Sequence, residues 1–189
     1  GTKTHLIYSM AETAHVPCHP HLGLSVLQRP NLISKNQVTI RYTSSIQIQM
    51  PVMTSYSIFP NILSQEKQDG YPLNLQLQKI LYYIQRELLQ QGLAGFSDDM
   101  EAWQFGPVAP AVYRQYCGFG AMPIRMQYNV KIEQDYVKLI VPIIERKRQL
   151  NPWDMVSDTH SVGKAWDIIY RNGLGDHQVI PKELIKNKG

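Results

Sequence analysis

The chain has 189 residues, enough for one domain with a hydrophobic core and an appendage but too few for two full domains. Apolar residues make up 43% and charged residues 18%, which excludes a chain that is disordered throughout. The net charge of +4 comes mainly from residues 1–52; residues 53–189 hold 15 basic and 14 acidic side chains, a balance that argues against a broad phosphate-binding face.

Hydropathy and cysteine content bear on the compartment. The sequence contains no run of 18 or more apolar residues and does not open with the pattern of a secretory signal peptide. Its two cysteines, Cys18 and Cys117, are far apart and make no disulfide framework. We therefore expect free thiols, no contact with a membrane and a cytoplasmic protein.

Residues 1–52 differ in character from the rest of the chain. They hold four of the six histidines and show no apolar stripe at helical spacing. Within residues 36–50, apolar and polar side chains alternate, a pattern that predicts one strand or a hairpin turning at residues 43–45. We expect an irregular or β-containing N-terminal extension at 1–52, followed by one domain at 53–189.

The extension also contains residue types that bind metals. His15, Cys18, His19 and His21 carry imidazole and thiol groups, which are common zinc ligands. Their spacing fits no established zinc finger, and prolines interrupt the segment. We expect a tail rather than a metal site, and no cofactor.

From residue 53 onward, helical patterns dominate. Apolar residues at helical spacing predict a helix at 56–68. The clearest pattern lies at residues 74–91, where Asn74 can cap the start of a helix and Gly92 can end it in the left-handed conformation.

Beyond that helix, residues 100–105 form a short extended run that Gly106 and Pro107 cut off. Further helices are predicted at 109–117, at the end of residues 130–144 after a short strand, and at 151–160, 161–172 and 180–185. The predicted fold class is mainly α, a compact multi-helix domain with a short β element.

Three motifs in this region resemble those of a known family. Residues 77–83 read LQKILYY, residues 101–113 read EAWQFGPVAPAVY, and Thr159-His160 is followed six residues later by Trp166. In this order they resemble the Panacea (SocA-like) antitoxin domain of bacteria and phages, over about residues 58–186. The resemblance implies an antitoxin that neutralises a cognate toxin by direct protein–protein binding. It also leaves open a proteolytic adaptor that delivers a toxin to a protease.

The motif side chains suit either a core or a partner surface. Aromatic residues are common in both. Gly106 allows an unusual backbone angle and Pro107 fixes the next one, so together they set the direction of the following helix. Lys79 is expected to be solvated or to pair with Glu101, and Gln78 to lie on the helix flank. The predicted partner-binding residues are Lys79, Tyr82, Tyr83, Glu101, Trp103, Phe105 and Tyr113.

Several function classes find little support in the sequence. Gly118-Phe119-Gly120 is not a phosphate-binding loop, and no serine lies in a nucleophile elbow, so we expect no enzyme. His160 lacks an obvious chemical partner and is expected to be structural. A DNA-binding phage-associated regulator remains the competing class, with phosphate contacts from residues 146–148, although we expect nucleic acid to be a less fitting partner than a toxin. A homo-oligomer is left open.

Overall fold

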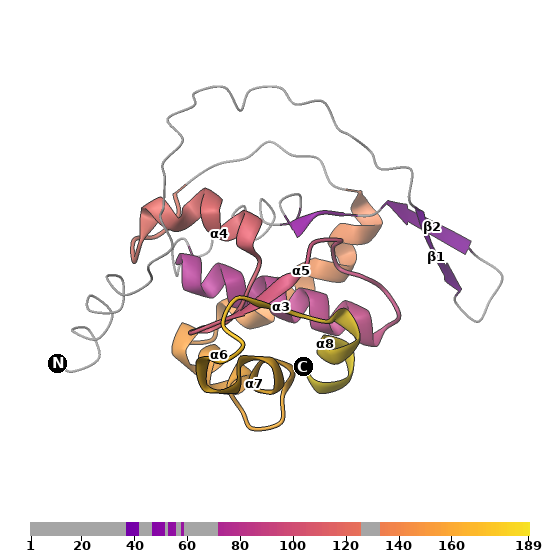
Figure 1. The fold of residues 1–189 in the computed structure, drawn as a ribbon. Coiled ribbons are helices and arrows are strands. Elements are labelled where there is room, and N and C mark those ends of the chain that lie inside the picture. The colour runs from indigo at the N-terminus through magenta and orange to yellow at the C-terminus, as the bar shows by residue number, and fades with distance from the viewer. Residues whose placement is uncertain (1–36, 42–46, 52, 56–57, 59–71, 126–132) are drawn as a thin grey trace.

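The computed structural model describes residues 53–55, 58, 72–125 and 133–189, together with the backbone of residues 37–41 and 47–51. A single helix, α3 (Asn74–Gln90), runs through the middle of the domain, with the other helices and the sheet around it (Figure 1). It packs against α5, α6 and α8 and against the sheet. Every residue from Leu77 to Gln85 is buried, so α3 is enclosed on all sides rather than along one stripe.

The ends of α3 differ in how well the sequence predicts them. Gly92 has a φ of +82° and ends the helix as predicted. Asn74 does not cap the start: it is the first helical residue, the cap position belongs to Leu73, and the Asn74 amide oxygen accepts a hydrogen bond from Gln78 instead.

A small antiparallel sheet lies beside α3. Its strands are β3 (Met100–Trp103), β4 (Gly106–Val108) and β5 (Gln178–Ile180), in the order β4-β3-β5. Trp103 pairs with Gly106 across the first hairpin, and Met100 pairs with Ile180 on the other side. This pairing brings the C-terminal part of the chain against the middle of the sequence.

The remaining helices surround this centre. They are α4 (Pro110–Tyr116), α5 (Gln134–Arg148), α6 (Pro152–Thr159), α7 (Ala165–Tyr170) and α8 (Lys182–Lys188), with short 3-10 turns at Cys117–Phe119 and Arg171–Gly173. Asn151 caps α6 by accepting from the Trp153 backbone N–H, as its sequence predicts. The chain is therefore mainly helical with a small sheet, in agreement with the predicted fold class.

Some sequence-based predictions need correction. Residues 161–172 form a shorter helix than expected, since α7 starts only at Ala165. Helix α5 begins at Gln134 and continues through Pro142 to Arg148, beyond the predicted end at residue 144. Cys117 is disulfide-bonded, so the expectation of free thiols is wrong for this residue and no longer supports a reducing compartment.

The N-terminal region contains a hairpin, one of the two forms predicted for residues 36–50. Strands β1 (Gln37–Arg41) and β2 (Gln47–Pro51) pair antiparallel, with Val38 opposite Met50. The predicted turn at 43–45, most of the helix predicted at 56–68 and the strand predicted after residue 130 lie outside the described residues, as do the histidines of the extension. No helix in the described part of the chain has the length and apolar character needed to cross a membrane.

Candidate functional site

The first two motifs meet at Lys79 and Gly106. The Lys79 side chain is 0% exposed, and its Nζ donates a hydrogen bond to the carbonyl oxygen of Pro107 at 3.1 Å. Gly106 has a φ of +101°, and a Cβ at this position would lie 2.6 Å from Lys79 Nζ and 2.9 Å from Thr159 Oγ1. Glycine is required here both for the backbone angle and for the space that the lysine occupies.

This position changes the chemistry of the lysine. Burial lowers the pKa of Lys79 to about 7, because removal from water disfavours the charged ammonium. Both sequence-based expectations for Lys79 are therefore wrong, since it is neither solvated nor paired with Glu101. The carboxylate of Glu101 instead accepts from the Trp103 indole N–H at 2.8 Å.

Two glutamines of α3 hold the loops that follow it. Gln78 Oε1 accepts from the Ala109 backbone N–H at 2.9 Å, and Gln78 is buried rather than on the flank. Gln85 donates to the Phe96 carbonyl oxygen and accepts from the Phe96 N–H, both at 3.0 Å. These amides satisfy backbone groups that would otherwise be buried without partners, so they fix the path of the chain around α3.

The third motif packs against the β3–β4 hairpin of the second motif. The Trp166 indole N–H donates to the Trp103 carbonyl oxygen at 2.8 Å, and the His160 ring stacks on Trp166 with centroids 3.6 Å apart and planes 1° from parallel. Burial, and then the charge of Lys79, lower the pKa of His160 to about 4, although Asp167 opposes the shift. His160 ends α6 as a neutral, stacked ring, which agrees with the structural role predicted for it.

Two aromatic pairs are anchored on the hairpin that joins β3 and β4. Trp103, 9% exposed, lies 4.7 Å from Tyr113 and 4.4 Å from His177 between ring centroids. Phe105, in the turn, lies 6.1 Å from Trp153 with the rings perpendicular. Tyr113, Phe105 and Trp153 are each half-buried, so both pairs present part of a ring to solvent. We call Trp103, Phe105, Tyr113 and Trp153 the hairpin aromatics.

The seven predicted partner-binding residues therefore divide into two sets. Lys79, Tyr82 and Tyr83 are at most 1% exposed, so their side chains belong to the core and offer no surface to a partner. Four others retain exposed surface, and partner contact stays a prediction for Glu101, Trp103, Phe105 and Tyr113. Trp153 was missed by sequence reasoning; the signal for it is an aromatic residue in the exposed first turn of a capped helix.

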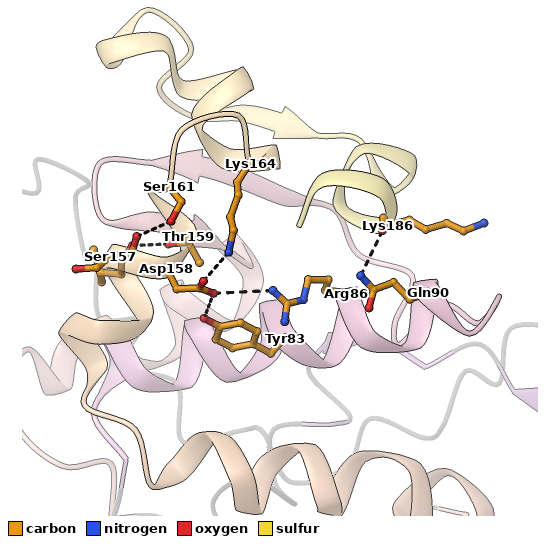
Figure 2. A network of polar contacts seen from close by, with 10 residues as sticks. Tyr83, Arg86, Gln90, Ser157, Asp158, Thr159, Ser161, Lys164 and Lys186 are labelled. Carbon is orange, nitrogen blue, oxygen red and sulfur yellow. Dashed lines mark hydrogen bonds and ion pairs between the residues drawn. The ribbon is translucent and has the colours of Figure 1, made fainter.

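A charged network one to two turns further along α3 was also missed (Figure 2). Asp158 of α6 accepts from the Tyr83 hydroxyl at 2.6 Å, forms an ion pair with Lys164 and lies 3.9 Å from Arg86. Burial opposes ionisation of Asp158, but hydrogen bonds from Lys164 and Tyr83, with the charges of Lys164 and Arg86, lower the pKa of its carboxyl. These residues come from α3, α6 and the loop after α6, so no local sequence pattern links them.

The described residues contain no group of three His, Cys, Asp or Glu side chains that could hold a metal ion. Comparison with known proteins addresses the family. A family model described as antitoxin SocA-like, Panacea domain, matches residues 77–167. Antitoxin SocA of Caulobacter vibrioides (strain NA1000 / CB15N) is 31% identical over 119 residues, which cover 54% of this chain and 61% of SocA, less than two thirds of that protein. No solved structure gives a significant match.

The matched residues contain all three motifs and the contacts that join them, from Lys79 at Gly106 to Trp166 at Trp103. Over residues 77–167 the chain is similar to the SocA-like Panacea domain.

Proposed function

We propose that this chain is the antitoxin of a toxin–antitoxin system and neutralises a cognate toxin by binding it directly. The observation that carries the proposal is the similarity of residues 77–167 to the SocA-like Panacea domain and to a protein named antitoxin SocA. An antitoxin of this kind acts by recognition, so it needs a stable scaffold and an exposed contact surface rather than catalytic groups.

The use of the motif residues supports a binding role. Their polar groups form hydrogen bonds within the domain. The Lys79 amine donates to one backbone carbonyl, and the Trp166 indole N–H donates to another. His160 is stacked and carries a pKa lowered to about 4, which makes it a poor general base near neutral pH. We propose no enzymatic activity for the chain.

The hairpin aromatics supply the proposed contact surface. Aromatic side chains that are partly exposed and held by rigid neighbours are favourable anchors, because little side-chain entropy is lost on binding. Phe105 and Tyr113 fit this description, since each packs against a tryptophan and still reaches solvent.

Co-expression tests the function. The protein encoded beside this chain is expressed alone and together with it, and growth is followed. The neighbour alone is expected to arrest growth, and the pair to grow. A neighbour that is harmless alone, or an arrest that persists despite abundant chain, would contradict the antitoxin role.

The chain could instead act on the same toxin as a proteolytic adaptor that delivers it to a protease, and this is the alternative mechanism. An adaptor lowers the amount of toxin in the cell, whereas a direct inhibitor leaves the toxin intact and bound. Immunoblotting of the toxin during growth rescue separates the two, with stable toxin expected under our proposal.

The DNA-binding alternative depends on residues 146–148. Arg146 forms an ion pair with Glu87, and the Lys147 ammonium lies over the Tyr83 ring at 3.9 Å. Glu87 offsets part of the positive charge of this basic run, which favours the antitoxin role over a regulator.

A further inference from the structure

Basic side chains from three parts of the fold gather around Tyr83, on the side of α3 that faces α5 and α6. Two acidic side chains lie among them, Glu87 and Asp158. Four positive charges thus meet two negative ones. We call the basic residues the cationic cluster: Arg86, Arg146, Lys147 and Lys164.

Both acidic residues already have close partners. Glu87 forms an ion pair with Arg146 at 2.5 Å. Asp158 uses one oxygen for Lys164 and the other for the Tyr83 hydroxyl, as Figure 2 shows. These two carboxylates therefore neutralise Arg146 and Lys164 more than they neutralise Arg86 and Lys147.

Two members of the cluster have no carboxylate at hydrogen-bond distance among the described residues. The Lys147 ammonium lies 3.9 Å from the centroid of the Tyr83 ring and is within ion-pair distance of no carboxylate in the described residues. The Arg86 guanidinium lies 4.7 Å from the same centroid and 3.9 Å from Asp158, and its Nε is buried with no hydrogen-bond partner in the described part of the chain. Burial, and then the charge of Arg86, lower the pKa of Lys147, although Glu87 and Asp158 oppose the shift.

We propose that the cationic cluster binds an acidic segment of a partner protein, whose side-chain carboxylates pair with Lys147 and Arg86. If the proposed function holds, that partner is the toxin. An ammonium and a guanidinium on one aromatic ring form a compact site for one or two carboxylates. Residues 53–189 carry nearly balanced charge and so lack a broad phosphate-binding face, which makes protein a better fit than nucleic acid.

A direct test uses the full chain and a fluorescein-labelled peptide of ten glutamates, followed by fluorescence anisotropy at low salt. Lys147→Gln removes one positive charge and is expected to weaken binding about fivefold, since a partly exposed charge pair contributes up to about 1 kcal/mol. Asp158→Asn removes a competing carboxylate and is expected to tighten binding by a similar factor. Lys138→Gln is the matched control: it lies on the same helix, is 72% exposed and is expected to leave affinity unchanged.

The opposite signs of the two variants separate recognition from a merely structural role, because disruption of the fold would weaken binding in both. Thermal melts confirm that each variant is folded. Absence of peptide binding by the unaltered chain, equal effects of Lys147→Gln and Lys138→Gln, or weaker binding by Asp158→Asn would overturn the inference. Tighter binding of duplex DNA of the same total charge would assign the cluster to phosphates and would overturn it too.

The peptide experiment needs no toxin, so its failure and failure of the growth-rescue experiment are distinguishable. Growth rescue without peptide binding leaves the antitoxin role and removes the cationic cluster from it. Peptide binding with the expected pattern but without growth rescue keeps the preference for carboxylates and removes the antitoxin role.

Discussion

The indole N–H of Trp166 donates to the main-chain carbonyl oxygen of Trp103 at 2.8 Å, although the two residues are 63 positions apart. This bond joins α7 to the end of β3, where the chain turns toward Gly106. Because Lys79 of α3 bonds to the next strand, at Pro107, one short hairpin is held from two helices. The hairpin aromatics are therefore presented from a fixed base.

The first prediction concerns this bond. Trp166→Phe keeps an aromatic ring for His160 to stack on but leaves the Trp103 carbonyl without its donor. The free energy of unfolding is expected to fall by about 2 kcal/mol, measured by urea denaturation, because a buried carbonyl loses its partner. Trp153→Phe is the control, with a loss of less than about 1 kcal/mol expected since that ring is half-exposed. Equal losses in the two variants would contradict the assigned role.

Gly106 gives the second prediction. Alanine at this position requires a backbone angle that L-residues rarely adopt and places its methyl group 2.6 Å from Lys79 Nζ. Gly106→Ala is expected to destabilise the chain by about 3 kcal/mol, through backbone strain and overpacking. Gly118→Ala, where a Cβ meets no atom within 4 Å, is expected to change stability by less than about 0.5 kcal/mol. A tolerated Gly106→Ala would show that the motif glycine is not needed for packing.

Lys79 gives the third prediction. Its pKa is about 7 in the folded chain and near 10.5 when exposed. Between these values the unfolded chain holds a proton that the folded chain does not, so this residue makes stability rise with pH from about 7 to about 10.5. The slope contributed is at most about 1.4 kcal/mol per pH unit. Lys79→Met is expected to remove it, and urea unfolding at about pH 7 and pH 9.5 measures the difference. An unchanged slope in Lys79→Met would contradict the burial of a neutral amine.

The fourth prediction concerns His160 at lower pH. Its pKa falls from 6.5 to about 4 on folding, so acidification below pH 6.5 protonates the unfolded chain first and lowers stability. His160→Phe keeps a ring against Trp166 but cannot be protonated. The melting temperature of this variant is expected to drop less than that of the unaltered chain between about pH 6.5 and pH 4.5. Parallel curves would show that His160 does not carry this dependence.

The fifth prediction tests the proposed contact surface. Phe105→Ala and Tyr113→Ala are each expected to weaken toxin binding at least about tenfold while the chain remains folded, because partly exposed aromatic anchors dominate many interfaces. Val162→Ala is the control, since this residue is 94% exposed and lies outside the hairpin aromatics. Isothermal titration with purified toxin measures the affinities. Equal affinities for all three variants would place the contact surface elsewhere.

The sequence predicted what local patterns encode. The apolar spacing of residues 74–91 predicted α3, and Asn151-Pro152 predicted the start of α6. The alternation at 36–50 predicted a strand or a hairpin, and β1 and β2 form a hairpin there. Each of these signals depends on residues within one turn or one strand pair of each other, so no tertiary information was needed.

The site required tertiary information that no single segment holds. A helix enclosed on all sides can bury polar residues if distant backbone groups satisfy them, which explains why Lys79 and Gln78 are internal although their types suggest the surface. The Asp158 network escaped prediction for the same reason, because its members come from three elements. Strand β5 also depends on pairing with β3, which lies about 80 residues earlier in the chain, since Met100 pairs with Ile180.

Inhibition of the purified toxin by the purified chain, in a reaction without any protease, tests the central claim most directly. We predict that one equivalent of the chain forms a complex with the toxin, seen by size-exclusion chromatography, and abolishes toxin activity. Undiminished toxin activity in the presence of excess folded chain would contradict neutralisation by direct binding.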